Sequence, residues 1–348
     1  MPTIKAAKAA NATYQPAYVP VAVFAGGTSG IGTAMAEALA RYTGGRAHIV
    51  LIGQNEVAAA HILSGLPKPP DDEGGWRHEF VRCDASEMAN IREVCADLRK
   101  RLVRINYLVL SAGANTMMWA GETSEGLDWH LSLRYYSRFV YIQELASLLA
   151  ASAELGQDAR VMSVLGAGFN FPPPTEDLNN VRARARSWKW LQGKGLLPCV
   201  AALRGMYISG GLNDAMVVWF AAKYPQLAFT HIHPGMVRTP GSNAALADLG
   251  WLLAPLSFAL RRLINFFVAV EQDTCAEWML HALLDPARVH GAFFVNRHGD
   301  VLSSCEGGLG ESSQKGFVNG VPMKGYAGSD AVVRLVCGYA EEVTRATK

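Results

Sequence analysis

Short apolar runs alternate with longer amphipathic stretches along most of the chain. Seven runs rich in β-branched and aromatic residues predict buried strands, at residues 21–25, 48–53, 79–83, 106–112, 160–165, 227–233 and 291–296. The stretches between and after them predict helices, at about 29–42, 55–64, 86–101, 124–152, 209–223, 271–284 and 329–345. From Leu127 to Leu149, apolar residues recur at every third or fourth position and form one continuous stripe. This alternation is typical of an α/β fold.

The segments outside this alternation divide the chain. We expect residues 1–17 to form a flexible or loosely docked tail, and residues 301–348 a C-terminal loop and helix. Residues 169–206 interrupt the pattern and predict an insertion on the substrate side, and residues 236–270 predict an apolar lid. The sequence therefore predicts a single Rossmann-type domain over 18–300, whose seven or so strands form one doubly wound parallel sheet.

Composition narrows the class of protein. Half of the 348 residues are apolar and the formal net charge is +2, so nothing in the charge favours nucleic acid as a partner. The six cysteines show no metal-type spacing, and the chain begins without the apolar core of a secretory signal. His231 and His233 alternate on one predicted strand, where we expect packing rather than a metal site. We expect a cytoplasmic protein with reduced thiols, no metal and a small-molecule substrate.

One apolar segment resembles a membrane span. Residues 250–270 are almost all apolar, but Arg261 and Arg262 lie in the middle and Pro255 interrupts the run. Two arginines at the centre of a bilayer would cost about 2.5–3.5 kcal/mol each. We therefore interpret the segment as a lid over the substrate pocket and expect no stable membrane span, with shallow binding at a membrane surface as the alternative.

The first predicted strand runs directly into closely spaced glycines and then into helix-forming residues. Glycines at such a turn let the backbone approach a phosphate, and the free amides at the positive end of the helix favour the anion. The strand–turn–helix context predicts a dinucleotide site made by Gly26, Thr28, Ser29, Gly30, Ile31 and Gly32. For Thr28 and Ser29, capping of the helix is the alternative role.

Four motifs resemble those of the short-chain dehydrogenase/reductase family, in the family's order over roughly residues 20–300. They are the TGxxxGIG-like turn at 25–32, Cys83-Asp84, the NNAG-like turn at 110–113 and the PGxVxT loop at 234–239. The resemblance implies that Asp84 contacts adenine, that Val237 and Thr239 lie at the nicotinamide end, and that Ser111, Ala112 and Gly113 of the NNAG-like turn also bind the cofactor.

Further stretches are similar to a divergent subgroup common in fungal secondary-metabolite pathways. They are the Tyr-Tyr-Ser-Arg run at 135–138, residues 176–178 and residues 212–216. The family resemblance also implies a dimer or tetramer formed through the helices at 86–101 and 124–152.

The residues after the second strand bear on which dinucleotide is bound. Enzymes selective for NAD usually carry an acidic residue there to hold the ribose 2′-hydroxyl. This chain has Gln54 and Asn55, with neither a carboxylate to repel a 2′-phosphate nor the arginine that often holds one. We therefore expect NADP (NADPH), with NAD less favoured.

The residues that the resemblance implies for catalysis are all substituted. Arg134 stands at the position of the helix Asn, Gly166 at that of the Ser, with Ser163 three residues earlier, and no Lys follows Tyr207 at the family spacing. A tyrosine without that Lys keeps a pKa of about 10 and is a poor acid at neutral pH. We nominate Tyr207, Arg134 and Ser163 as replacements. Their alternatives are a packed aromatic ring, a surface salt bridge and a buried strand residue, respectively.

Three functions remain open from the sequence. The first is an NADP(H)-dependent reductase that acts on a ketone or iminium in a bulky apolar specialised metabolite, with a non-standard proton donor. The second is a non-redox cyclase, isomerase or rearrangement catalyst that keeps the dinucleotide as a fixed element. The third is a non-catalytic cofactor-binding protein.

Overall fold

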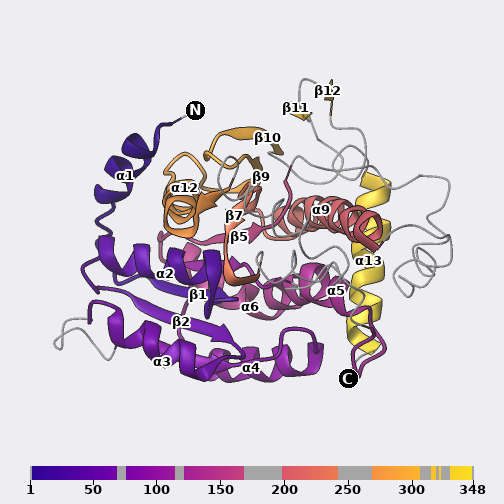
Figure 1. The fold of residues 1–348 in the computed structure, drawn as a ribbon, viewed down its shortest axis with the longest axis horizontal. Coiled ribbons are helices and arrows are strands. Elements are labelled where there is room, and N and C mark those ends of the chain that lie inside the picture. The colour runs from indigo at the N-terminus through magenta and orange to yellow at the C-terminus, as the bar shows by residue number, and fades with distance from the viewer. Residues whose placement is uncertain are drawn as a thin grey trace, which may run out of the picture.

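A ten-stranded sheet runs through the centre of the molecule (Figure 1). The computed structural model describes residues 2–68, 76–113, 121–167, 198–241, 269–305, 315–318, 321–322 and 330–346. The sheet order is β12-β11-β10-β9-β6-β5-β4-β1-β2-β3. These strands are β1 Val21–Ala25, β2 His48–Gly53, β3 Glu79–Arg82, β4 Tyr107–Leu110, β5 Arg160–Val164, β6 Ala228–Ile232, β9 Gly291–Val295, β10 Val301–Cys305, β11 Lys315–Val318 and β12 Val321–Pro322.

Helices cover both faces of the sheet. They are α1 Ile4–Ala12, α2 Gly30–Tyr42, α3 Glu56–Gly65, α4 Met88–Arg101, α5 Trp129–Leu131, the π-helical segment η1 Ser132–Tyr136, α6 Ser137–Glu154, α9 Pro198–Lys223, α12 Gln272–Leu284 and α13 Asp330–Ala346. Alternate residues of β1 point to different cores. Val21 and Val23 pack with the helices α4, α6, α9 and α13, whereas Ala22 and Phe24 pack with α2, α3 and α12.

The predicted α/β architecture is confirmed. All seven predicted strands are present, with ends that differ by one or two residues, and they pair in parallel, for example Val23 with Val50 and Leu108. Every residue of β1 is buried, as expected for a parallel strand covered on both faces.

The sheet is larger than predicted and is not wholly parallel. Strands β10, β11 and β12 extend it beyond β9 in antiparallel pairing. A tight turn makes this possible: Asn296 Oδ1 accepts hydrogen bonds from the amides of His298 and Asp300, and Gly299 has a φ of +87°. The Asn-x-x-Gly-Asp sequence of this turn is the signal that the strand pattern alone missed.

The N-terminal residues form a docked helix instead of a loose tail. Thr3 caps α1, and Asn11 at its end is buried and donates from Nδ2 to the backbone oxygen and to Oε2 of Glu277, both at 2.9 Å. Glu277 lies on α12, beside which α1 is seen in Figure 1. A further correction concerns α9, which begins at Pro198, eleven residues before the predicted start and inside the predicted 169–206 insertion.

The remainder of that insertion and most of the predicted lid lie outside the described residues. The two ends of the 236–270 segment are joined by β7 Val237–Arg238 and β8 Val270–Glu271, which pair in parallel as a separate two-stranded sheet. Among the described helices, none combines the length and the apolar character that crossing a bilayer requires.

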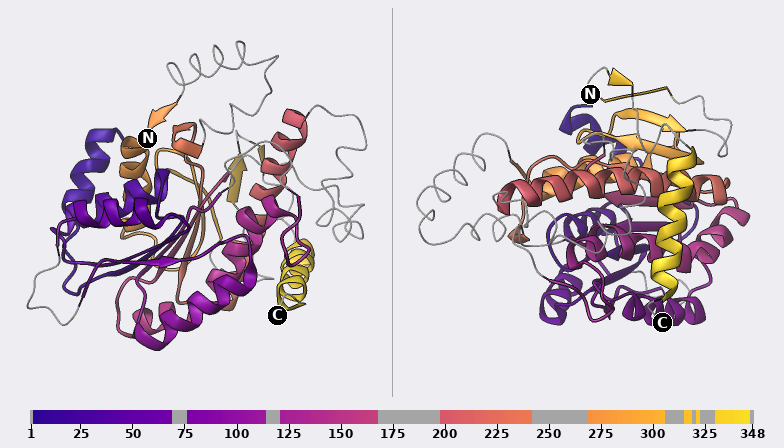
Figure 2. Two further views of the ribbon diagram at one scale, coloured as in Figure 1. Left: turned by 60° about the horizontal axis from the view of Figure 1, so that its bottom comes forward. Right: turned by 90° about the vertical axis from the view of Figure 1, so that its right-hand side faces the viewer.

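The C-terminal helix α13 packs against α9, and the right-hand view of Figure 2 shows it running across one side of the molecule. Its buried residues Val333, Val336, Cys337 and Ala340 join the core that contains α4, α6 and α9. Polar links at its far end fix the helix further: Arg92 of α4 donates to the Thr344 carbonyl, and Lys223 of α9 pairs with Glu341 at 3.2 Å. The helix is therefore part of the folded core.

The buried face of α13 gives a stability test with a built-in control. We expect Val336→Asp to lower the free energy of unfolding by about 3 kcal/mol or more, because Val336 is only 2% exposed and a lone carboxylate would be buried there. The neighbouring Leu335 is 47% exposed, so Leu335→Asp is expected to change stability by less than about 0.5 kcal/mol. Urea unfolding of both variants measures the difference, and equal effects would contradict the packing of α13.

Candidate functional site

The turn between β1 and α2 packs tightly against the end of β4. Gly26 has a φ of +92°, and a Cβ at this position would stand 2.5 Å from the backbone nitrogen of Ala112. A Cβ at Gly32 would stand 2.4 Å from both the Gly26 carbonyl oxygen and the Ser111 hydroxyl. Only glycine fits these two positions, because any side chain would collide with the backbone or with Ser111. The predicted turns at 25–32 and 110–113 therefore meet.

The start of α2 is open to an anion. Its N-cap residue Ser29 is exposed, makes no side-chain capping bond and is followed by no acidic residue in the first turn. The amides of Gly30, Ile31 and Gly32 belong to the first turn, where an α-helix has no internal acceptors for them. A Cβ at Gly30, whose φ is +62°, would stand 3.2 Å from Thr239 Cγ2. The 234–239 loop thus lies next to the glycine turn.

The remaining predicted cofactor residues are held by local hydrogen bonds or exposed. Asn55 Oδ1 accepts from the Ala58 amide at 2.9 Å and caps α3, whereas Gln54 is exposed. Asp84 Oδ1 accepts from the amide and the hydroxyl of Ser86, at 2.9 and 2.7 Å, which fixes the turn after β3. Asn55 therefore has a structural role whether or not it also contacts a ligand.

Thr28 lies against the end of β2. A Cβ at Gly53 would stand 2.4 Å from Thr28 Oγ1, so the threonine is packed beside the segment that the resemblance assigns to the ribose. Gly113 is exposed at the end of the described part of its turn, and Val237 is buried and pairs with Val270. These positions, together with the glycine turn, fit an NAD(P) dinucleotide, because they leave backbone room, free amides and no acidic side chain where the phosphates would lie.

A buried arginine joins the ends of β4 and β5. Arg138, on the first turn of α6, is 1% exposed. Its Nη1 donates to Ser163 Oγ at 2.6 Å and to the Val164 carbonyl at 3.0 Å, and its Nη2 donates to the Ala112 carbonyl at 2.9 Å. All three acceptors are neutral, so within the described ranges this buried cation has no hydrogen-bonded carboxylate.

Asn213 extends this network to the π-helical segment. The Ser163 hydroxyl donates to Asn213 Oδ1 at 2.7 Å, and Asn213 Nδ2 donates to the backbone carbonyls of Arg134 and Ser209, both at 2.8 Å. Arg134 lies within η1, and a π-helical turn frees carbonyls from the α-helical pattern and is frequent at functional sites. The term Arg138 network is used below for four hydrogen-bonded groups: the side chains of Arg138, Ser163 and Asn213 and the backbone carbonyl of Arg134.

A second buried pair lies next to this network. Asp214 follows Asn213 on α9, and its Oδ1 lies 2.5 Å from His231 Nδ1. His231 Nε2 accepts from the Gly166 amide at 3.2 Å, so the proton of the neutral ring is on Nδ1 and is donated to Asp214. Burial raises the pKa of Asp214, and the neighbouring His231 opposes that shift. The pair fixes the backbone where the resemblance puts the catalytic Ser.

Arg134 presents a second guanidinium close to Arg138. Its Nη1 is buried and has no hydrogen-bond partner in the described part of the chain. Burial lowers the pKa of Arg134 to about 10, against an opposing effect of Asp128. Burial and the charge of Arg134 lower the pKa of Arg138 to about 9. Both groups are therefore protonated at neutral pH, and the salt bridge considered for Arg134 is not found among the residues that the structure describes.

The three nominated catalytic residues have different surroundings. Ser163 is fully buried, and its hydroxyl is used twice within the Arg138 network, which matches the buried-strand alternative. Arg134 is linked to Ser163 through Asn213. Tyr207 lies on α9, six positions before Asn213, but its side chain is outside the described part, so its role stays a prediction.

Sequence reasoning missed Arg138, Asn213 and Asp214 as members of one site. A signal was present: Arg138 interrupts the apolar stripe of 124–152, and Asn213-Asp214 interrupt the apolar stretch of 208–222. Polar residues at positions that should be buried indicate a hydrogen-bonded network. No cluster of three metal-ligating side chains occurs among the residues that the structure describes.

Comparison with known proteins decides the family. The model of the short chain dehydrogenase family matches residues 20–168. Oxidoreductase andH of Emericella variicolor is 30% identical over 268 residues, which cover 75% of this chain and 72% of that protein. The chain belongs to the short-chain dehydrogenase/reductase family. An oxidoreductase of Emericella nidulans is 31% identical over 239 residues, with coverage of 69% of this chain and 65% of that protein.

A solved structure supports the fold of this dehydrogenase/reductase. A variant of actinorhodin polyketide ketoreductase, solved with NADPH, aligns with a TM-score of 0.53 and 16% identity, over 78% of this chain and 92% of the ketoreductase. At this identity the likeness concerns the Rossmann-type fold alone. The predicted family and fold are both confirmed.

The glycine turn gives a test of dinucleotide binding. We expect Gly30→Asp to weaken NADPH binding at least a hundredfold, because the side chain would crowd Thr239 and place a negative charge at the start of α2. Gly44→Asp is the control, because Gly44 has a similar φ of +59° but nothing within 4 Å of an added Cβ. Calorimetric titration with NADPH measures both variants. An unchanged affinity of Gly30→Asp would place the phosphates elsewhere.

A substitution of Ser163 tests whether the Arg138 network stabilises the fold or takes part in catalysis. We expect Ser163→Ala to lower the free energy of unfolding by about 1–3 kcal/mol, because Arg138 Nη1 and Asn213 Oδ1 each lose a buried partner. Ser64→Ala is the control, since its hydroxyl is exposed and bonds only within its own helix turn. Chemical denaturation measures stability, and NADPH affinity should stay unchanged. A loss of turnover with no loss of stability would make Ser163 a catalytic residue.

Proposed function

We propose that this chain is an NADP(H)-dependent oxidoreductase that reduces a ketone or iminium in a bulky, largely apolar specialised metabolite. The observation that carries the proposal is the meeting of the glycine turn with the Arg138 network at one end of the sheet: the Ala112 backbone faces Gly26 on one side and accepts from Arg138 on the other. When bound, the nicotinamide would supply the hydride. The family of the chain and the oxidoreductase names of its relatives support redox chemistry.

NADP is preferred over NAD for an electrostatic reason. Gln54 and Asn55, the two residues directly after β2, carry no negative charge that would repel a 2′-phosphate, and the first carboxylate is that of Glu56 in the first turn of α3. The NADPH bound to the polyketide ketoreductase agrees with this preference. For the substrate, the polyketide on which that enzyme is named to act and the aromatic residues of 169–206 and 236–270 favour a bulky apolar molecule.

Arg134 is the group that we assign to the substrate oxygen. Its cationic guanidinium is fixed by burial, and its Nη1 has no hydrogen-bond partner in the described part of the chain, whereas the hydroxyl of Ser163 is fully used. A preorganised cation stabilises negative charge that develops on a carbonyl oxygen during reduction. It does not supply the proton, which Tyr207 or water provides; an iminium needs none.

We expect Arg134→Met to lower kcat for a neutral bulky ketone by about a hundredfold, the usual effect of removing one donor to a developing oxyanion. Arg99→Met is the control, because Arg99 pairs with Glu144 on the surface of α4 and α6, away from the network. Tyr207→Phe is measured in parallel and should slow turnover at least tenfold if Tyr207 is the proton donor.

The assay follows the absorbance of NADPH together with product mass, using aromatic polycyclic ketones. Equal consumption of NADPH and formation of alcohol supports reduction. Product that forms without loss of NADPH would support the non-redox alternative, a cyclase, isomerase or rearrangement catalyst. Normal rates for Arg134→Met would remove Arg134 from the mechanism.

A further inference from the structure

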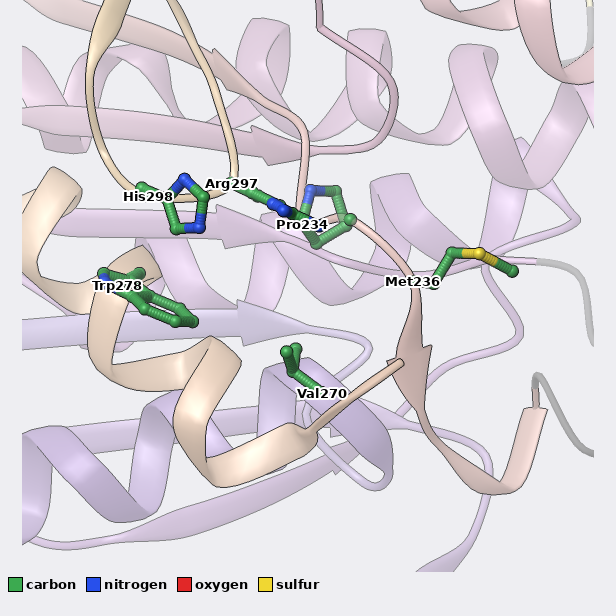
Figure 3. Close-up of a pocket in the computed structure, with 7 residues that line it drawn as sticks. Pro234, Met236, Val270, Trp278, Arg297 and His298 are labelled. Atoms are coloured by element: carbon green, nitrogen blue, oxygen red, sulfur yellow. The ribbon is translucent and has the colours of Figure 1, made fainter. Parts of the chain in front are cut away.

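A small pocket opens beside the 234–239 loop. Its volume is about 260 Å³, and Figure 3 shows its lining from Pro234 and Met236, from Val270, from Trp278 on α12, and from the turn between β9 and β10. This volume lies just below the range of about 300–1,000 Å³ that holds drug-sized ligands, so the pocket fits a molecule of one or two rings.

The pocket is distinct from the Arg138 network. None of the residues that line it belongs to η1, α6 or α9, which carry the network. They come instead from the side of α12, which packs with α2 on the other face of the sheet. A ligand here would touch the Pro234–Gly235 backbone from the side opposite to α9.

The walls of the pocket suit a flat ring. The indole of Trp278 and the imidazole of His298 lie edge to face, with centroids 5.0 Å apart and an interplanar angle of 81°. The Pro234 ring and the side chains of Met236 and Val270 complete an apolar surface. Such a combination of aromatic and aliphatic walls binds planar ligands.

A cationic side chain lines this pocket. Arg297 is exposed, and none of the ion pairs found within the described ranges involves it. Asp300 in the same turn is engaged by Asn296 Nδ2 at 3.0 Å. Burial and the charge of Arg297 lower the pKa of the nearby His233 and His298, so these rings are neutral at neutral pH.

The backbone accommodates this arginine. Gly235 has a φ of +75°, and a Cβ there would stand 3.0 Å from Arg297 Cδ. The aliphatic stem of Arg297 therefore lies against the loop where glycine leaves room for it, which holds the guanidinium near Pro234 (Figure 3). The stem of this exposed arginine is therefore positioned by the loop.

We propose that this pocket binds a small planar ligand with a single negative charge, of the aromatic carboxylate class, and that Arg297 is its anchor. A guanidinium donates two parallel hydrogen bonds to a carboxylate, and the rings of Trp278 and His298 cover the flat part of the ligand. This inference is independent of the proposed reductase activity, because it needs neither hydride transfer nor Arg134.

The test uses naphthalene-2-carboxylate and its neutral isostere naphthalene-2-carboxamide, titrated calorimetrically into the full chain. We expect the carboxylate to bind at least ten times more tightly than the amide. Arg297→Gln should abolish this preference, whereas Arg77→Gln, a change at another exposed arginine, should leave it intact. Trp278→Leu should weaken both compounds by a similar factor.

The experiment is repeated with saturating NADP⁺. An unchanged affinity for the carboxylate places it outside the cofactor site and supports the proposal. Competition with NADP⁺, equal affinities for the two compounds, or a preference that survives Arg297→Gln would each overturn it. Thermal unfolding of the Arg297→Gln and Trp278→Leu variants checks that a lost preference does not come from a lost fold.

Discussion

The backbone of Ala112 contacts both the glycine turn and Arg138, and these two contacts hold the candidate site together. Its nitrogen donates to the Ala25 carbonyl at 3.0 Å and lies against Gly26, where no Cβ fits. Its carbonyl accepts from Arg138 at 2.9 Å. The same residue therefore contacts the glycine turn through its nitrogen and the helix that carries Arg138 through its carbonyl. Glycine is needed at position 26 because a side chain there would collide with this backbone, and Arg138 satisfies the Ala112 carbonyl.

The Arg138 network contributes more to the geometry of the site than to the stability of the fold. A buried guanidinium that has only neutral acceptors loses its hydration and gains no ion pair, so it contributes little to stability. What it does contribute is position: Arg138, Ser163 and Asn213 link β4, β5, α9 and η1 through buried hydrogen bonds. Breaking one link leaves buried groups unpaired, so the arrangement is specific even where it is not stabilising.

Much of the fold could be predicted from the sequence, because strand and helix periodicities are local properties. All seven parallel strands and the glycine turn follow from runs of apolar residues and their flanks. The contacts of Arg138 with Ser163 and Ala112 could not be predicted in this way. They join residues 25 and 26 positions apart, and no pattern within one element specifies such a pair. The docking of α1 through Asn11 and Glu277 spans 266 positions and was missed for the same reason.

The shared direction of the parallel strands explains why the Arg138 network and the Trp278 pocket lie close together. In a parallel α/β sheet the carboxyl ends of all strands face one side, and ligands bind there. Helices α6 and α9 bring the Arg138 network to this edge from one face, and α12 brings Trp278 from the other. The 234–239 loop lies between them, with Thr239 against Gly30 and Gly235 against Arg297. Gly30 and Gly235, both with positive φ, make room for these two contacts, so the loop packs closely between the two sides without closing either of them.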